Sequence, residues 1–171
     1  MRQCILDSSE LLSCYEHLLR EVVCPYLKAK LNEEDPLETG QNSMVFYCQY
    51  PPTLRLQPGP SSRPRRQHRD AEFGHQDGEV NFWMPLTDYD RTHTTLWVES
   101  MPNANDFHPL ILDVGRIAMF HGTLVRHYVP PNPTSFLRVS IDFRVGIGRY
   151  FDPKWTLEGL QHYHGRHKII L

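Results

Sequence analysis

The hydrophobic and polar positions follow a helical period near the start of the chain and a strand-like period after it. From Asp7 to about Leu31, apolar residues recur every three or four positions, as on one face of an amphipathic helix. Asp7 and Glu10 have the spacing of a capping box, and Pro25 should kink or interrupt the helix. The pattern predicts a helix that covers a core formed by the rest of the chain.

From Met44 onward the apolar positions come in short runs that turn residues separate. This spacing is typical of an all-β sandwich or barrel. The expected strands are Met44–Gln49, Thr53–Gln57, Glu79–Leu86, Thr94–Glu99, Pro109–Asp113, Arg116–Phe120, Leu124–Tyr128 and Phe136–Val145. The segment Gln57–Arg66 is rich in proline, glycine, serine and arginine and is expected to be a loop.

Length and composition suit one globular domain. The chain has 171 residues, of which 40% are hydrophobic and 22% are charged. We expect residues 1–43 to form a helical cover, 44–148 a β-barrel core and 149–171 a C-terminal tail, in which Trp155–Tyr163 could form a short helix. A net charge of -2 argues against binding to nucleic-acid backbones or to anionic membranes.

The cysteines and the N-terminus bear on the compartment. No apolar run approaches the ~20 residues of a membrane helix, and because the first residues have no sustained apolar core we do not expect a signal peptide. Cys4, Cys14, Cys24 and Cys48 form no CxxC pair, which favours buried reduced thiols over a disulfide framework or a zinc site. We therefore expect a cytoplasmic protein.

The run Phe136–Val145 alternates almost perfectly between apolar and polar residues, so Arg138, Ser140, Asp142 and Arg144 share one face. By pattern alone this favours a half-buried edge strand with a solvated polar face. The alternative is the interior of a barrel, where the guanidinium of Arg138 and the hydroxyl of Ser140 would bind a small acid.

Histidines and carboxylates form a candidate metal site. His68 and Asp70 lie two residues apart, as do His75 and Asp77, so on an extended chain the two side chains of each pair point the same way. With His127 from a later strand, either pair gives two histidines and one carboxylate. That set binds iron in the non-haem Fe(II) oxygenases.

These motifs resemble those of the Fe(II)/2-oxoglutarate-dependent oxygenases, in particular the phytanoyl-CoA-dioxygenase-like branch and the StrG-like enzymes of streptomycin biosynthesis. The resemblance covers roughly residues 44 to 148. It implies a double-stranded β-helix, which is a cupin-like jelly roll, with the N-terminal helix packed outside. It also implies iron held by HxD…H and 2-oxoglutarate held by an arginine of the last strand. The segments that carry it are His68–His75, Glu79–Thr87, Thr95–Ser100, Met119–Gly122, Arg126–Tyr128, Asn132 and Arg138–Val145.

On this resemblance the expected iron ligands are His68, Asp70 and His127. The pair His75 and Asp77 is the alternative dyad. It is disfavoured because it lies closer to the next strand than the family's dyad does, and because Asp77 begins an Asp-Gly pair typical of a hairpin turn.

His121 competes with His127 as the third ligand, since both would lie on one face of a strand. Phe120 and Gly122 match the Phe-x-Gly segment that precedes the family's ligand, and Asn132 matches an asparagine that follows it. Both matches favour His127.

The remaining candidates belong to the cofactor and to the substrate. The resemblance implies that Arg138 and Ser140 bind the distal carboxylate of 2-oxoglutarate, and Asn81 is placed beside them in the cofactor pocket. Arg65, Arg66 and Arg69 form either a basic rim for an anionic substrate or a solvated run of charge. Weaker substrate candidates are Trp83, Glu99, Arg55 and Tyr128.

The predicted function is an Fe(II)- and 2-oxoglutarate-dependent dioxygenase that uses O2 to hydroxylate a small polar molecule. Two alternatives stay open. A cupin-type metalloenzyme that does not use 2-oxoglutarate would need the metal ligands but not Arg138 and Ser140. A non-catalytic barrel that binds a small molecule or a protein would have no need of an open metal position.

Overall fold

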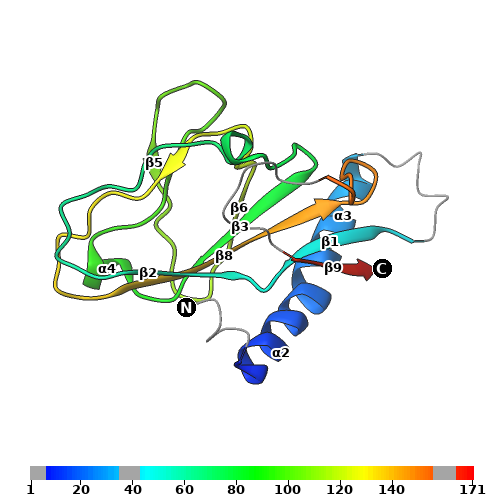
Figure 1. The fold of residues 1–171 in the computed structure, drawn as a ribbon, viewed down its shortest axis with the longest axis horizontal. Coiled ribbons are helices and arrows are strands. Elements are labelled where there is room, and N and C mark those ends of the chain that lie inside the picture. The colour runs from blue at the N-terminus through cyan, green and yellow to red at the C-terminus, as the bar shows by residue number, and fades with distance from the viewer. Residues whose placement is uncertain (1–6, 35–42, 156–164) are drawn as a thin grey trace.

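Two antiparallel sheets and an N-terminal helical segment make up the residues that the structure, a computed structural model, describes: 7–34, 43–155 and 165–171 (Figure 1). The larger sheet contains β1 (Val45–Tyr50), β2 (Thr53–Gln57), β3 (Glu79–Pro85), β6 (Ala118–Phe120), β8 (Arg138–Ile147) and β9 (Gly165–Ile170). Its order is β6-β3-β8-β1-β9, and β2 also pairs with β8. The chain is therefore mainly β, as the short apolar runs predict.

The smaller sheet consists of three two-residue strands, β4 (Trp97–Val98), β5 (His108–Pro109) and β7 (His127–Tyr128), in the order β5-β4-β7. All three strands are shorter than the predicted runs Thr94–Glu99, Pro109–Asp113 and Leu124–Tyr128, and β5 begins one residue before its run. Side chains take over part of the backbone pairing here: the hydroxyl of Thr95 donates to the carbonyl of Leu110, at 2.7 Å. Short helical turns, η3 (Asp70–Phe73) and α4 (Tyr89–Thr92), flank this region.

The predicted N-terminal helix is present and continues slightly further than expected. It consists of α2 (Ser9–Leu18), a π-helical turn η1 (Leu19–Val23) and α3 (Cys24–Glu34). Pro25 does not break the helix. The wider π turn lies directly before it and accommodates the proline ring and its missing N–H group.

The start of this helix differs from the prediction. The N-cap is Ser8, whose hydroxyl accepts a hydrogen bond from the backbone N–H of Leu11 at 3.4 Å. A capping box of Asp7 and Glu10 is therefore wrong, because Asp7 stands one residue before the position that can reach the free N–H groups of the first turn.

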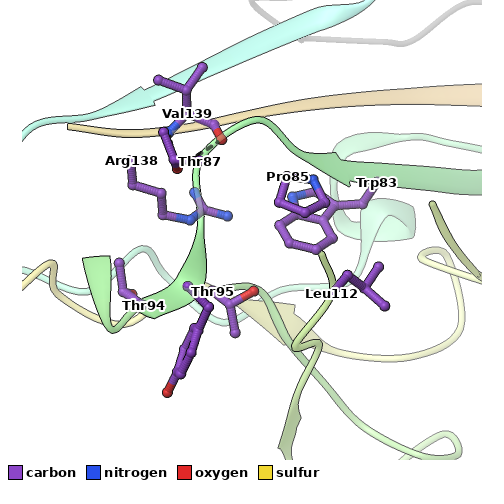
Figure 2. A pocket seen from close by; sticks show the side chains of 9 residues that line it. Trp83, Pro85, Thr87, Thr94, Thr95, Leu112, Arg138 and Val139 are labelled. Atoms are coloured by element: carbon purple, nitrogen blue, oxygen red, sulfur yellow. Dashed lines mark hydrogen bonds between the residues drawn. The ribbon is translucent and has the colours of Figure 1, made fainter. Parts of the chain in front are cut away.

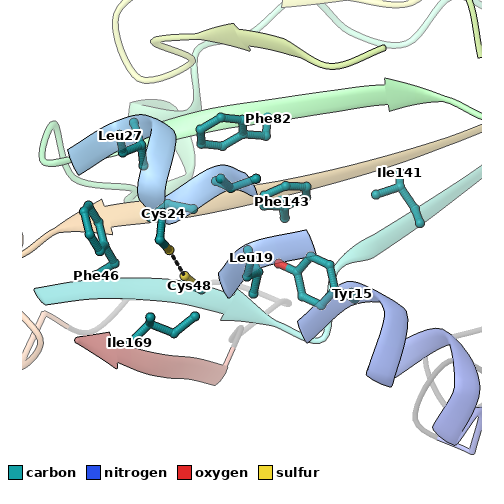
Figure 3. Packing of buried hydrophobic residues seen from close by; sticks show 12 residues of the cluster. Tyr15, Leu19, Cys24, Leu27, Phe46, Cys48, Phe82, Ile141, Phe143 and Ile169 are labelled. Atoms are coloured by element: carbon teal, nitrogen blue, oxygen red, sulfur yellow. Dashed lines mark hydrogen bonds between the residues drawn. The ribbon is translucent and has the colours of Figure 1, made fainter. Parts of the chain in front are cut away.

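The helical segment packs on one face of the larger sheet, and the side chains between them form the main core (Figure 3). The ring of Tyr15 meets Phe143 edge-on at 5.1 Å between centroids, and its hydroxyl donates to the carbonyl of Gln49 at 2.8 Å. Fully or nearly fully buried residues of this core are Tyr15, Leu19, Val23, Cys24, Leu27, Phe46, Cys48, Phe82, Ile141, Phe143, Val145 and Ile169.

The cysteines largely follow the prediction of buried, reduced thiols. Cys24 and Cys48 are free and buried, with their sulfur atoms 3.7 Å apart (Figure 3). Cys14 is also free but is exposed, so the expectation of burial is wrong there. Cys4 lies outside the described residues.

The strand β8 is central, which corrects the edge-strand interpretation of its pattern. It pairs with β3 on one side and with β1 and β2 on the other. Its apolar face contacts the helical segment, and on its polar face Arg138, Ser140 and Arg144 are buried rather than solvated. Because both faces are covered, this polar face can form a site.

The C-terminal tail contains a strand that the sequence pattern does not predict. β9 pairs with β1 over its whole length and forms the edge of the larger sheet. The helix expected over Trp155–Tyr163 lies, apart from its first residue, outside the described residues. Among the described helices, none has the length and the apolar character needed to cross a membrane.

Candidate metal centre

Two histidines and one aspartate from two separate parts of the chain meet at the polar face of the larger sheet. His68 and His127 form an isolated antiparallel bridge, in which each residue donates its N–H to the carbonyl of the other, at 3.2 and 3.0 Å. Residues paired in this way place their side chains on the same face. Their rings accordingly lie 4.5 Å apart between centroids.

Asp70 completes the cluster from the start of η3. Its N–H donates to the carbonyl of Gly122 at 2.8 Å, which fixes the backbone beside β6. Its Oδ1 lies 3.6 Å from Nε2 of His127 and 3.7 Å from Nε2 of His68. Ligand atoms of all three residues lie within 4.8 Å of one another, so the three could hold one metal ion.

In both histidines the ring nitrogen Nδ1 contacts a backbone carbonyl, which leaves Nε2 facing the cluster. Nδ1 of His68 lies 2.8 Å from the carbonyl of Arg66, and Nδ1 of His127 lies 3.3 Å from the carbonyl of Val125. A carbonyl only accepts hydrogen bonds, so a ring that donates from Nδ1 to these carbonyls keeps Nε2, the nitrogen that faces Asp70, available as a metal ligand.

Protonation states favour the same arrangement. Burial, reinforced by the neighbouring His127, lowers the pKa of His68 and keeps its ring neutral. Burial opposes ionisation of Asp70, but the charge of Arg144 and hydrogen bonds outweigh it and hold the pKa of Asp70 well below its usual range. A neutral histidine and an ionised carboxylate are the forms that bind metal ions.

A second candidate site lies at the start of β8, in a cleft into which Arg138 projects (Figure 2). The guanidinium lies over the ring of Trp83, 5.7 Å from its centroid. The side chains of Trp83, Pro85, Thr87, Tyr89, Thr94, Thr95, Leu112, Arg138 and Val139 line this cleft.

Arg138 and Ser140 are buried with hydrogen-bonding capacity to spare. Nη2 of Arg138 and Oγ of Ser140 have no partner among the described residues, although Arg138 is only 4% exposed and Ser140 is fully buried. Burial lowers the pKa of Arg138 to about 10, against the opposing charge of Asp142, so the side chain is still a cation at neutral pH. Buried polar groups are rarely left unsatisfied. The pair is therefore suited to an anionic ligand with oxygen acceptors.

Comparison with known proteins gives one close relative in sequence. No family model matches the chain. The streptomycin biosynthesis protein StrG of Streptomyces griseus is 37% identical over 116 residues, which is 67% of this chain and 53% of StrG. The chain is a StrG-like protein. The resemblance predicted from the motifs is thereby confirmed, and the chain spans about half the length of this relative.

The fold of this StrG-like protein is similar to that of a solved non-haem monooxygenase, ThoJ, in its nickel complex. The TM-score is 0.51 at 20% sequence identity, over 62% of this chain and 46% of that chain. A weaker likeness, at a TM-score of 0.47 and 20% identity over 71% of this chain and 59% of that chain, is to SnoN, an α-ketoglutarate-dependent epimerase from nogalamycin biosynthesis. Only the first likeness is strong enough to show a shared fold.

The alternative dyad of the StrG-like protein lies outside the cluster. Nδ1 of His75 is 3.4 Å from the carboxylate of Glu79, which also accepts from Arg166 at 2.6 Å. Burial opposes ionisation of Glu79, but these two partners outweigh it and lower its pKa. Asp77 is exposed. His121, the rival third ligand, contacts the hydroxyl of Thr123 at 2.8 Å.

Asn81 contacts the metal cluster rather than the cleft. Its Nδ2 donates to Oδ2 of Asp70 at 2.6 Å, and its Oδ1 is buried without a partner among the described residues. Arg144, which the sequence analysis placed on the polar face of β8 without a role, donates to the same oxygen from Nε at 2.8 Å. The alternation of β8 was the signal that could have singled out Arg144.

The weaker substrate candidates divide between the cleft and other places. Trp83 lines the cleft. Glu99 is 2% exposed, and its carboxylate accepts the backbone N–H groups of residues 105 and 126. Arg55 pairs with Asp142, at 2.5 Å. Tyr128 packs edge-on against Phe107, at 5.2 Å between centroids.

The basic residues near the metal ligands are partly paired. Arg66 forms an ion pair with Glu72 at 2.8 Å, with most of its side chain in solvent. Arg69 donates to the side chain of Asn103. These contacts favour a solvated run of charge over a rim dedicated to a substrate.

Proposed function

We propose that this StrG-like chain is a non-haem Fe(II)- and 2-oxoglutarate-dependent oxygenase that hydroxylates a small polar molecule with O2. One observation carries the proposal. The cluster of His68, Asp70 and His127 occurs together with a buried cation and a buried hydroxyl, on Arg138 and Ser140, that lack a partner among the described residues.

The residues of the cluster fit a divalent iron ion. Two imidazole nitrogens and one carboxylate oxygen form the ligand set of the non-haem Fe(II) oxygenases, and this set leaves coordination positions open for other ligands. Nε2 of His68, Nε2 of His127 and Oδ1 of Asp70 would hold the ion. When bound, iron and 2-oxoglutarate together supply the oxidising power for attack on a C–H bond by O2.

The residues of the cleft fit the distal carboxylate of 2-oxoglutarate. A guanidinium binds a carboxylate through parallel hydrogen bonds, and the hydroxyl of Ser140 projects to the same side of β8 as Arg138. Trp83 and Leu112 provide apolar walls that exclude water. We also propose that the two antiparallel sheets form the double-stranded β-helix of this family, with the two sites on its inner face.

Anaerobic titration with Fe(II) and then with 2-oxoglutarate tests the proposal. We expect the weak visible charge-transfer band of an iron–keto acid complex. Arg138→Ala should lose the band while Fe(II) still binds. The matched control is Arg55→Ala, which removes an arginine of the adjacent strand that pairs with Asp142 and does not line the cleft.

Two results would contradict the proposal in different ways. Metal binding without the band, in the wild type, would favour a cupin-type metalloenzyme that does not use 2-oxoglutarate. Failure of the wild type to bind any divalent metal would favour a non-catalytic binding barrel.

A further inference from the structure

One oxygen of the Asp70 carboxylate is occupied by two donors from the larger sheet. Nδ2 of Asn81 and Nε of Arg144 both donate to Oδ2, at 2.6 and 2.8 Å. A carboxylate oxygen offers two lone-pair positions, so these two hydrogen bonds use the capacity of Oδ2. Oδ1, which faces His68 and His127, is the oxygen left for a metal ion.

The two donors are themselves held in place. Asn81 and Arg144 are directly opposite each other in the pairing of β3 with β8, and Nη1 of Arg144 also donates to Oε1 of Gln49 at 3.2 Å. Gly122 lies against Asn81, and a Cβ atom at that position would come within 2.6 Å of Nδ2. A glycine is therefore needed for Asn81 to reach Asp70.

Arg144 differs from the other buried arginine of β8 in what it contacts. Arg138 projects into the cleft with a nitrogen that has no partner among the described residues. Arg144 is directed to Asp70 instead and does not line the cleft. Asp70 is only 1% exposed. Arg144 therefore places a cation in direct contact with this buried carboxylate.

We propose that Arg144 and Asn81 are positioning residues that hold Asp70 in one orientation and restrict it to a single metal-binding oxygen. The proposal rests on the proposed metal site. By engaging Oδ2, the two residues keep Asp70 from taking up a second coordination position, so that position stays available to other ligands. Side chains that orient a metal ligand in this way commonly control the affinity of the site.

Binding of Co(II), used as a spectroscopic probe, tests the proposal without any requirement for activity. We expect Asn81→Ala and Arg144→Lys to weaken Co(II) binding about 10- to 100-fold, as is typical when a ligand loses its orienting partner. We also expect the visible absorption of bound Co(II) to change, because a freed carboxylate alters the coordination of the ion.

The matched control is Arg166→Gln. Arg166 is another largely buried arginine of the same sheet, paired with the carboxylate of Glu79 at 2.6 Å, and none of its hydrogen bonds or ion pairs is to Asp70. This variant should bind Co(II) with the affinity and the spectrum of the wild type. Near-ultraviolet circular dichroism establishes that each variant is folded, and Asn81→Ala tests the idea even where an Arg144 variant does not fold.

Three results would overturn the inference. Wild-type affinity and spectrum in Asn81→Ala, or in a folded Arg144→Lys, would show that neither residue orients Asp70. An equal loss in Arg166→Gln would show that any buried arginine of the sheet has the same effect through general loosening. Failure of the wild type to bind Co(II) would overturn the proposed metal site itself, which separates that failure from the first two.

Discussion

Arg138 and Arg144 lie on one strand and face the same side of the sheet, and both are buried, at 4% and 6% exposure. We nevertheless expect their replacement by methionine to change the free energy of unfolding in opposite directions. Methionine keeps an unbranched side chain of similar length and removes the charge, so the comparison isolates what each guanidinium contacts.

Arg138→Met should stabilise the protein in the absence of ligand. Burial lowers the pKa of Arg138 from its usual range to about 10, which corresponds to a cost of about 3 kcal/mol for keeping this side chain charged in the folded state. The variant removes that cost and loses the contact of the guanidinium with the Trp83 ring, worth about 0.5–2 kcal/mol. A net gain of about 1–3 kcal/mol follows.

Arg144→Met should destabilise the protein by about 3–5 kcal/mol, because it leaves the buried carboxylate of Asp70 without its cation. Urea unfolding at neutral pH, in the presence of a chelator, measures both differences. In a second series without chelator, Mn(II) saturates both proteins. Adding 2-oxoglutarate at about 100 times its Kd should then stabilise the wild type by a further ~2.7 kcal/mol and give Arg138→Met no further stabilisation.

The result that would refute this reasoning is a loss of stability in Arg138→Met as large as that in Arg144→Met. Such a loss would mean that Arg138 has a stabilising partner in the folded protein and is not held ready for an anionic ligand. Stabilisation of Arg138→Met by 2-oxoglutarate equal to that of the wild type would exclude the cleft as its binding site.

Three further predictions follow from particular contacts. His68→Ala should abolish Co(II) binding measured by calorimetry while His75→Ala retains it, and the reverse result would assign the metal to the other dyad. Gly122→Ala should weaken Co(II) binding by about the same factor as loss of Asn81, since the new Cβ displaces that side chain; unchanged binding would contradict the close approach. The pKa of Glu79 is lowered in the folded protein, so its contribution to stability is complete above its unfolded pKa of about 4.3 and is lost as pH falls through the lower folded value. Urea unfolding should therefore show a large destabilisation by Glu79→Gln at neutral pH and a smaller one at about pH 3, and an equal difference at both would refute the assignment.

The hydrophobic periodicity of the chain predicts much of the fold. The helical period from Asp7 to about Leu31 and the short apolar runs from Met44 onward predict a helix followed by a β domain. The alternation in β8 identifies the residues that share a face with Arg138. Local patterns of this kind are set by backbone geometry, which fixes which side chains point the same way in a helix or a strand.

Periodicity does not reveal what covers a face. The polar face of β8 is compatible with solvent or with a buried site, and the strand is central only because β1, β2 and β3 pair with it. The strand β9 has no clear apolar alternation, and its pairing with β1 depends on an edge that distant residues create. Glu99 is buried for a similar reason, since it satisfies backbone N–H groups of segments that come together only in the fold.

The same division applies to the candidate site. The sequence by itself determined the types of residue available, namely two His-x-Asp pairs, several later histidines and a strand with arginines on one face. The tertiary structure decided which pair lies beside His127, because the backbone bridge at His68 is a contact between segments far apart in the chain. It also decided that one buried arginine of β8 meets a carboxylate and the other meets an open cleft, since the partner of a charge depends on long-range packing that no local pattern encodes.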